Sequence, residues 1–306
     1  MNTIVYYLVF SLWWLLSLLP WRLHYVLSDA VLYPLFRFVL RYRRRLVREN
    51  LATSFPDKST EELRRIEARF YHWLCDYFVE LIKQASMSRE DILRHMEFVG
   101  VDECVADFKA SSQPLCVVYL AHYANWEWFT AFSSLVPKEH VAAQIYHPLH
   151  NKAMDRILLR NRSICGAPSF TMNETLRAVL THRREGRPLY LGCIADQSPK
   201  ANALHHWMPW LNHDTAVITG SETIGQKVGA IYYYVDVERV KRGYYRATMR
   251  RLEAPSDAHP AADDAPVSKF PMTEAYMNAV AESIERDPAL WLWTHRRWKH
   301  KRQQTQ

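Results

Sequence analysis

Between residues 115 and 252, short runs of apolar residues alternate with segments whose apolar positions recur every three or four residues. Short apolar runs are typical of buried strands, and apolar positions that recur every three or four residues are typical of helices. The alternation predicts an α/β fold with a mostly parallel central sheet flanked by helices. The tripeptide KRG at Lys241–Gly243 predicts a hairpin, and therefore an antiparallel edge. The expected strands are residues 115–121, 141–146, 188–195, 230–240 and 244–252.

Helices are predicted before and after these strands. Ser59 and Glu62 have the spacing of a capping box, and apolar residues then recur at helical spacing as far as residue 86. A final helix is expected over 273–286, after a surface loop over 253–267 that is rich in Ala, Pro and Asp. Because no linker divides this region, residues 59–306 are expected to form one catalytic domain.

The first 58 residues have the character of a membrane-binding segment. Residues 1–22 carry no charge before Arg22, and at about 1.5 Å per residue they could cross, or nearly cross, a hydrocarbon core of roughly 30 Å. The segment lacks the basic start and cleavage site of a signal peptide, so we expect an uncleaved N-terminal membrane-anchoring helix. Residues 23–58 are apolar and basic, which is typical of a segment in the membrane interface. The alternative is that both segments are buried core helices.

The net charge of +7 in 306 residues indicates an anionic partner. The basic run over 41–48 follows the apolar segment and predicts a catalytic domain on the cytoplasmic face. No nucleic-acid-binding module is recognisable, so no nucleic-acid partner is expected. The five cysteines are scattered and never form C-x-x-C, which argues against disulfides and zinc. No metal is expected either, because His205, His206, His213 and Asp214 match no ligand spacing.

The most informative local pattern is CVVYLAHYANWE, in which an apolar run ends at His122 and Glu127 follows five positions later. Within one regular helix these two residues would lie about 140° apart, so they can meet only if His122 precedes the helix. Asn125 is a good N-cap and places Glu127 in the first helical turn. Glu127 could then accept a hydrogen bond from one imidazole nitrogen and leave the other as a general base. The other interpretation is a polar residue with a purely structural role.

HYANWE at His122–Glu127 is similar to the H-x4-D/E signature of the glycerolipid and lysophospholipid acyltransferase superfamily. Other motifs follow in the order seen in the lipid A late acyltransferases, and together they span nearly the whole chain. These are the N-terminal anchor, RENLATSFPD at Arg48–Asp57, YHPL at Tyr146–Leu149, IADQ at Ile194–Gln197 and WLWTHRRWK at Trp291–Lys299. The chain therefore resembles the lauroyl- and myristoyl-type members of that family.

This resemblance implies a glycerolipid acyltransferase-like fold and the transfer of a fatty acyl chain to a hydroxyl of a lipid A precursor. The implied donor is acyl carrier protein or acyl-CoA, the acceptor is an anionic glycolipid, and no cofactor is needed because the thioester is already activated. His122 would be the general base, and Glu127 would orient it. The implied location is the cytoplasmic face of the inner membrane of a Gram-negative bacterium.

Substrate-binding roles follow from the resemblance alone. Relatives present arginines at positions equivalent to 156, 160 and 162 toward substrate phosphate or the carrier, and the choice among the three stays open. The C-terminal basic set, which consists of His295, Arg296, Arg297 and Lys299, would hold lipid phosphates or face the headgroups. The candidates are Tyr146, Arg156, Arg160, Arg162, Asp196, Gln197, His295, Arg296 and Arg297.

Two other functions remain open at this point. The motifs around His122 do not read the acceptor headgroup, so a lysophospholipid or an aminolipid is an alternative acceptor. The basic ends and the many aromatic residues also fit a non-catalytic membrane-binding protein.

Overall fold

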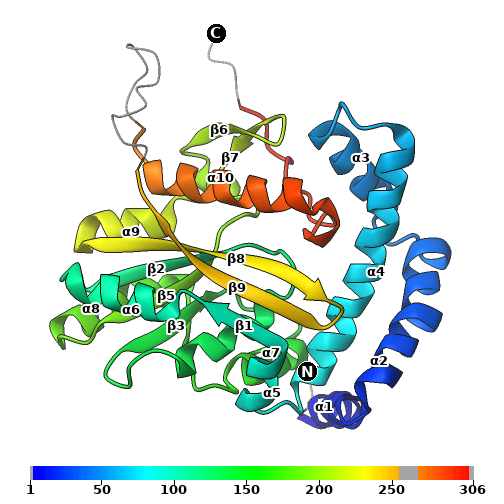
Figure 1. The fold of residues 1–306 in the computed structure, drawn as a ribbon, viewed down its shortest axis with the longest axis horizontal. Coiled ribbons are helices and arrows are strands. Elements are labelled where there is room, and N and C mark those ends of the chain that lie inside the picture. The colour runs from blue at the N-terminus through cyan, green and yellow to red at the C-terminus, as the bar shows by residue number, and fades with distance from the viewer. Residues whose placement is uncertain (1–2, 255–267, 303–306) are drawn as a thin grey trace.

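A seven-stranded sheet forms the centre of the computed structural model, which describes residues 3–254 and 268–302 (Figure 1). The strand order is β1-β9-β8-β2-β5-β3-β4. Strands β8, β2, β5, β3 and β4 run parallel to one another, whereas β9 is antiparallel to β8 and β1 is parallel to β9. The strands are β1 (Met96–Val99), β2 (Leu115–Leu120), β3 (Val141–Tyr146), β4 (Ser169–Thr171), β5 (Leu189–Ile194), β8 (Ala230–Lys241) and β9 (Tyr244–Leu252).

All five strands expected from the sequence are present, and the predicted α/β class is confirmed. The hairpin at Lys241–Gly243 is also confirmed, because β8 and β9 pair antiparallel on either side of it. The antiparallel pair does not form the edge, however, since β1 adds outside β9. The two short outer strands, β1 and β4, were not predicted, because runs of three or four residues give little periodic signal.

Helices cover both faces of the sheet. On one face, Tyr119 of β2 stacks on Tyr276 of α10 (Pro271–Arg286), with ring centroids 4.4 Å apart, and accepts a hydrogen bond from Ser221 of α9 (Gly220–Val228) at 2.9 Å. On the other face, the Tyr190 ring of β5 contacts the Phe108 ring of α6 (Val101–Ala110), with ring centroids 4.8 Å apart. A strand buried from both sides reads as a continuous apolar run, which explains why β2 is buried at every position.

The remaining elements complete these layers and a small second sheet of β6 and β7. They are α2 (Trp21–Leu27), η1 (Ser28–Leu32), η2 (Leu35–Val39), α3 (Arg44–Ser54), α4 (Thr60–Gln84), α5 (Arg89–His95), α6 (Val101–Ala110), η3 (Trp126–Ser134), α7 (Lys152–Arg162), α8 (Met172–Arg184), η4 (Ala201–Ala203), β6 (Trp207–Trp210), β7 (His213–Ala216), α9 (Gly220–Val228), α10 (Pro271–Arg286) and η5 (Pro288–Leu290), with α1 (Thr3–Ser17) before them.

The two helices predicted around the strands are confirmed. In α4, the Ser59 side chain accepts from the Glu62 backbone and Glu62 accepts from the Ser59 backbone, which is the reciprocal capping box expected there. The final helix, α10, begins two residues before its predicted start and ends at the predicted residue, Arg286. Most of the predicted loop over 253–267 lies outside the described residues.

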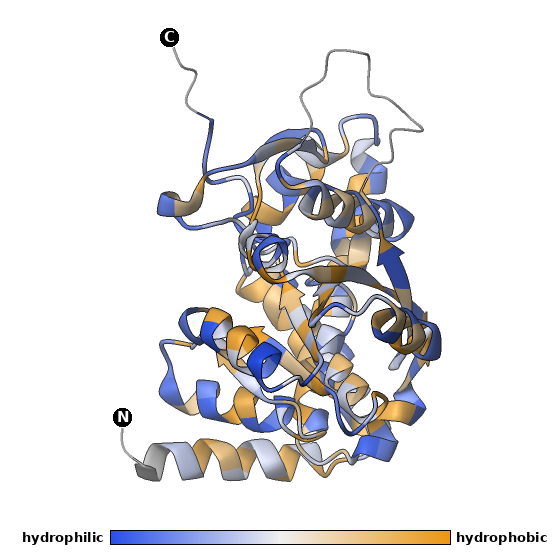
Figure 2. Cartoon of the chain, turned by 90° about the vertical axis from the view of Figure 1, so that its left-hand side faces the viewer, coloured by the Kyte–Doolittle hydropathy of each residue, from blue (hydrophilic) through white to orange (hydrophobic). Residues whose placement is uncertain are grey.

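The N-terminal segment folds into several short helices. None of the described helices is by itself long and apolar enough to cross a membrane, but the bent pair of Trp21–Val39 and Arg44–Ser54, with 81° between its parts, meets the criteria of length and composition. Figure 2 shows α1 along one edge of the molecule with apolar turns on its surface. Helix α1 packs on α7, where the Arg156 guanidinium lies 4.3 Å from the Tyr6 ring centroid. The boundaries at residues 22 and 58, and the anchor itself, stay predictions.

Candidate active site

The turn after β2 carries the histidine singled out by the sequence. β2 ends at Leu120, and η3 begins after Asn125, whose side-chain oxygen accepts a hydrogen bond from the Trp128 backbone N–H at 3.3 Å. The backbone N–H of Ala124 donates to the Leu290 carbonyl at 2.8 Å, which ties the turn to the C-terminal segment. His122 therefore lies between a strand and a helix, as predicted.

A buried aspartate orients the imidazole of His122. Nδ1 lies 2.7 Å from Oδ1 of Asp196, and the His122 backbone N–H donates to Oδ2 at 3.0 Å. The sheet register explains this contact. Leu120 in β2 lies opposite Ile194 in the parallel strand β5, so the residues two positions further along, His122 and Asp196, lie beside each other. Because the carboxylate accepts from Nδ1–H, the lone pair of the neutral ring is on Nε2.

Asp196 is ionised despite its complete burial. Burial alone would raise its pKa, but the attraction and hydrogen bonds of His122, together with the 2.7 Å hydrogen bond from Trp291 Nε1, hold the pKa of Asp196 below its ordinary value. The Asp196 carboxylate is the acceptor in all three hydrogen bonds, which favours its ionised form. A carboxylate held in this way stabilises positive charge on His122 whenever the ring takes up a proton.

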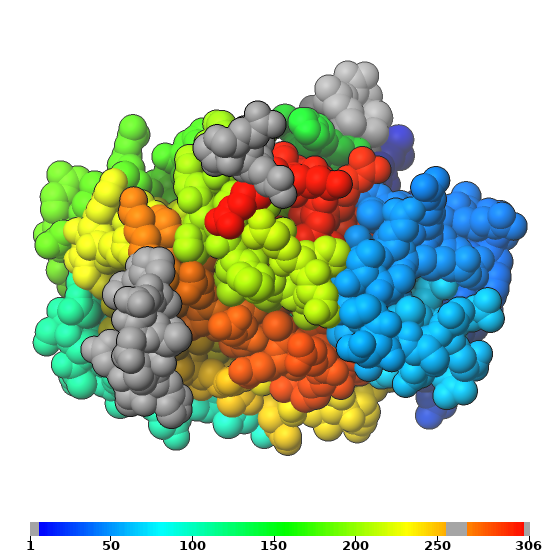
Figure 3. Space-filling model, turned by 90° about the horizontal axis from the view of Figure 1, so that it is seen from above, coloured from blue at the N-terminus to red at the C-terminus, as the bar shows by residue number. Residues whose placement is uncertain are grey.

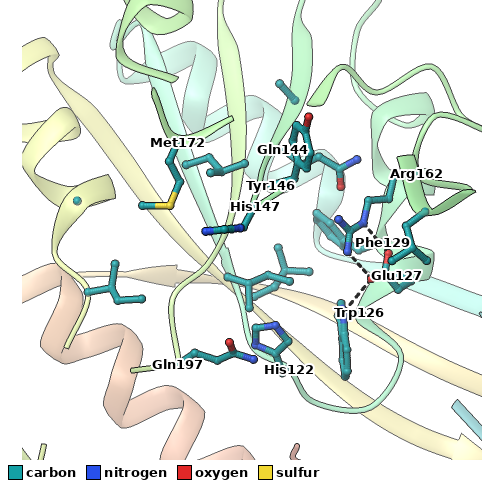
Figure 4. A pocket seen from close by; sticks show the side chains of 18 of the residues that line it. His122, Trp126, Glu127, Phe129, Gln144, Tyr146, His147, Arg162, Met172 and Gln197 are labelled. Carbon is teal, nitrogen blue, oxygen red and sulfur yellow. Dashed lines mark hydrogen bonds and ion pairs between the residues drawn. The ribbon is translucent and has the colours of Figure 1, made fainter. Parts of the chain in front are cut away.

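The predicted hydrogen bond between His122 and Glu127 is wrong. Glu127 instead accepts from Arg162 through Nε at 2.8 Å and Nη2 at 2.6 Å, and from Trp126 Nε1 at 3.1 Å. Figure 4 shows the Trp126 side chain between the imidazole and the Glu127 carboxylate. The bidentate fork of an arginine satisfies both carboxylate oxygens, which one imidazole N–H cannot do. The positioning contact expected from Glu127 is made by Asp196.

The same ion pair fixes Arg162. Burial alone would lower the pKa of the Arg162 guanidinium, but the charge and hydrogen bonds of Glu127 raise it above its ordinary value. The ion pair therefore keeps Arg162 charged at neutral pH. It holds the half-buried guanidinium of Arg162 at one side of the site. The ion pair uses Nε and Nη2 of Arg162 and does not use the Nη1 hydrogens.

A cavity of about 850 Å³ opens at the carboxyl ends of the parallel strands (Figure 4). His122, Glu127 and Arg162 line it, as do the predicted substrate-binding residues Tyr146 and Gln197. Its other walls are largely aliphatic and aromatic, which suits an apolar chain. These apolar lining residues include Leu120, Trp126, Phe129, Phe132, Ala142, Ala143, Ile145, Leu149, Leu158, Leu159, Ala167, Met172, Ile194 and Ile218.

The three arginines of α7, left undivided by the sequence, have different positions. Arg162 lines the cavity, whereas Arg156 and Arg160 are exposed and lie over the rings of Tyr6 and Phe10 in α1, at 4.3 and 4.6 Å. Arg156 and Arg160 therefore do not line the cavity, and a contact of either with substrate phosphate or with the carrier stays a prediction. Their cation–π contacts hold α1 against α7 instead.

The C-terminal basic set lies beside the cavity rather than along it. His295 Nε2 accepts from the Ser198 backbone N–H at 3.1 Å, and burial lowers the pKa of His295 to about 4. Arg297 is 2% exposed, and within the described chain its Nε and Nη2 have no hydrogen-bond partner. Burial lowers the pKa of Arg297 to about 10, against the attraction of Asp196. Arg296 is exposed.

Sequence reasoning missed the roles of Trp291 and Trp126. Trp291 donates to Asp196, and the Trp126 ring lies edge-on to the His122 ring with centroids 5.1 Å apart. Both lie inside motifs quoted above, but a tryptophan in a motif does not reveal which carboxylate it reaches. Of the histidines considered as metal ligands, His206 contacts Glu274 at 2.7 Å and His213 stacks on Trp298 at 3.9 Å.

Comparison with known proteins gives two findings. The family model described as bacterial lipid A biosynthesis acyltransferase matches residues 1–300. The lipid A biosynthesis lauroyltransferase of Escherichia coli strain K12 is 22% identical over 289 residues, which cover 94% of this chain and 88% of the relative. The match covers the strands, the cavity and the C-terminal segment together.

Proposed function

Because the chain belongs to the bacterial lipid A biosynthesis acyltransferase family, we propose that it moves a fatty acyl chain from acyl carrier protein to a hydroxyl of a lipid A precursor. The observation that carries the proposal is the His122–Asp196 pair at the wall of a mostly apolar cavity. The pair supplies a base of fixed tautomer, and the cavity suits an acyl chain.

In the proposed reaction, Nε2 of His122 removes the proton of the acceptor hydroxyl as its oxygen attacks the thioester carbonyl. The tetrahedral intermediate then collapses: the new C–O bond remains, the C–S bond breaks, and the imidazolium returns its proton to the departing thiolate. The buried Asp196 stabilises the imidazolium between these two steps. General-base help of this kind is typically worth about 10² to 10⁴ in rate.

The Glu127–Arg162 pair has a separate role in this proposal. It fixes the cation at the cavity wall, from which the Nη1 hydrogens of Arg162 can hold the oxyanion or an anionic group of the acceptor. Arginine suits such groups because its donors form a planar fork. The role of Glu127 is then to position Arg162 rather than His122.

We also propose that the protein binds the cytoplasmic face of the inner membrane. Support comes from exposed apolar side chains in the N-terminal helices and from the basic run beside them. They include Leu8, Leu12, Leu15, Leu18, Leu23, Val26, Val31, Phe38, Val39 and Leu40. The finer topology is testable by proteolysis of oriented vesicles, in which the catalytic domain is expected to be cleaved from the cytoplasmic side.

The deciding experiment is mass spectrometry of total lipids from cells with and without the gene. A lipid A species that lacks one fatty acyl mass is expected in the deletion strain, and its restoration requires wild-type protein. A variant His122→Ala is expected not to restore it, whereas His72→Ala, a half-exposed histidine of α4, serves as the matched control. Loss of acyl mass from a phospholipid or an aminolipid would select the alternative acceptors, and an unchanged lipid profile would favour a non-catalytic membrane protein.

A further inference from the structure

Helix α8 exposes an apolar stripe next to the cavity. Met172, Leu176 and Leu180 follow one another at intervals of four, so they share one face of the helix. They are 55%, 40% and 40% exposed. Helix α8 follows β4, the outermost strand of the sheet, so no further strand lies beyond it to provide a covering helix. Adjacent exposed apolar side chains on one face indicate a contact surface.

Basic side chains flank this stripe. Arg177, Arg183 and Arg184 are exposed and line a shallow groove with Leu176 and Leu180. Within the described residues none of the three arginines forms an ion pair, although Glu174, whose carboxylate caps α8 through Thr171, lies near enough to Arg177 for the two charges to attract each other. Because its lining holds three arginines and no carboxylate, the groove presents a net positive charge beside aliphatic surface.

The stripe reaches the active-site cavity. Met172, the first residue of α8, is also part of the cavity lining that contains His122 and Arg162. A partner lying along α8 is thereby in a position to feed a flexible arm over Met172 into the cavity. Lys200 lies in the same lining and adds a further cation.

We propose that this α8 surface, defined as Met172, Leu176, Arg177, Leu180, Arg183 and Arg184, docks the acidic acyl carrier protein that delivers the acyl thioester. The inference rests on the proposed function. Charge complementarity supports it, because guanidinium groups pair with the carboxylates of an acidic protein surface and the leucines pack on the apolar residues between them.

The position of α8 argues against the lipid bilayer as the occupant. The exposed apolar residues of α2 and the elements that follow it gather at one end of the molecule, and α8 lies toward the opposite end of its longest axis (Figures 1 and 3). In Figure 3 the N-terminal helices are blue and the segment that contains α8 is green. A membrane held by α2 would thus leave the α8 surface free for a protein.

The test compares two donors with full-length protein in vesicles. Arg183→Glu with Arg184→Glu is expected to raise KM for acyl-acyl carrier protein about tenfold with little change in kcat, because two attractive contacts become repulsive. Transfer from a small acyl-pantetheine thioester, which needs no docking, is expected to be unchanged. Arg64→Glu with Arg65→Glu, two exposed arginines of α4, makes the same charge change and is expected to leave both donors unaffected.

Further variants separate charge from structure. Arg183→Lys with Arg184→Lys is expected to keep KM within about threefold of wild type, and Leu176→Ser with Leu180→Ser is expected to raise it severalfold without lowering the melting temperature, since both leucines are exposed. Unchanged KM in the charge-reversed variant would overturn the docking proposal. So would reduced vesicle flotation in place of a donor effect, or transfer from coenzyme A but not from the carrier. Absence of transfer by wild-type protein from every donor would instead refute the proposed function.

Discussion

Replacement of Asp196 by Asn tests the mechanism most directly, because it keeps the shape of the side chain and removes its charge. The carboxylate accepts three hydrogen bonds, one at Oδ1 from Nδ1 of His122 and two at Oδ2 from the His122 backbone and Trp291. Asparagine has a single acceptor oxygen. The amide is expected to turn this oxygen toward the two donors and its NH2 group toward Nδ1.

This rotation changes the tautomer of His122. An NH2 group facing Nδ1 requires a lone pair on Nδ1, so the proton of the neutral ring moves to Nε2, the nitrogen that serves as the base. The expected loss in kcat is about 10² to 10⁴, the range that general-base catalysis supplies, which corresponds to about 2.7 to 5.4 kcal/mol. Nitrogen chemical shifts of the ring are expected to show the exchange of tautomers.

Single-turnover transfer of a labelled acyl chain is the assay, and Glu127→Gln is the companion variant. Glu127→Gln weakens the hold on Arg162, so it is expected to raise KM and to lower kcat by about tenfold or less. The opposite ranking would refute the reasoning. If Glu127→Gln matched His122→Ala while Asp196→Asn kept nearly full kcat, Glu127 would be the residue that orients the base.

Three other predictions follow from the structure. Arg156→Ala with Arg160→Ala is expected to keep kcat within about twofold and, because two cation–π contacts with α1 are lost, to lower the free energy of unfolding by about 1–2 kcal/mol in thermal unfolding. Arg162→Ala is expected to lower kcat/KM at least tenfold. The pKa of His295 is about 4 when folded and about 6.5 when unfolded, so stability is expected to fall on the order of 1–2 kcal/mol as pH decreases from 6.5 toward 4, and His295→Gln removes this part of the pH dependence in denaturant titrations. Ala142→Leu narrows the cavity and is expected to shift the preferred donor toward shorter acyl chains, measured by competition between donors.

Much of the fold could be predicted from the sequence because its physics is local. Buried parallel strands require continuous apolar runs. The start of helix α4 is recognisable from the capping box that Ser59 forms with Glu62. The short strands β1 and β4 could not be found in this way. Each has four residues or fewer and owes its place to pairing with a neighbour that is distant in sequence. The different positions of the α7 arginines could not be predicted from the sequence either, because they depend on α1 packing against Arg156 and Arg160.

The structure brings His122, Glu127 and Asp196 close together, as expected, but it pairs them differently from the prediction. The H-x4-E spacing correctly placed His122 before a helix and Glu127 in the first turn of that helix, because those features are set by the chain within six residues. The partner of the imidazole is decided elsewhere, by the register of β2 with β5, which brings a residue 74 positions away to Nδ1. The spacing of residues within one motif carries no information about the register between two strands that are distant in sequence. The predicted strand ends did place His122 and Asp196 at the same edge of the sheet, and adjacency of β2 and β5 was the one further fact needed to join them.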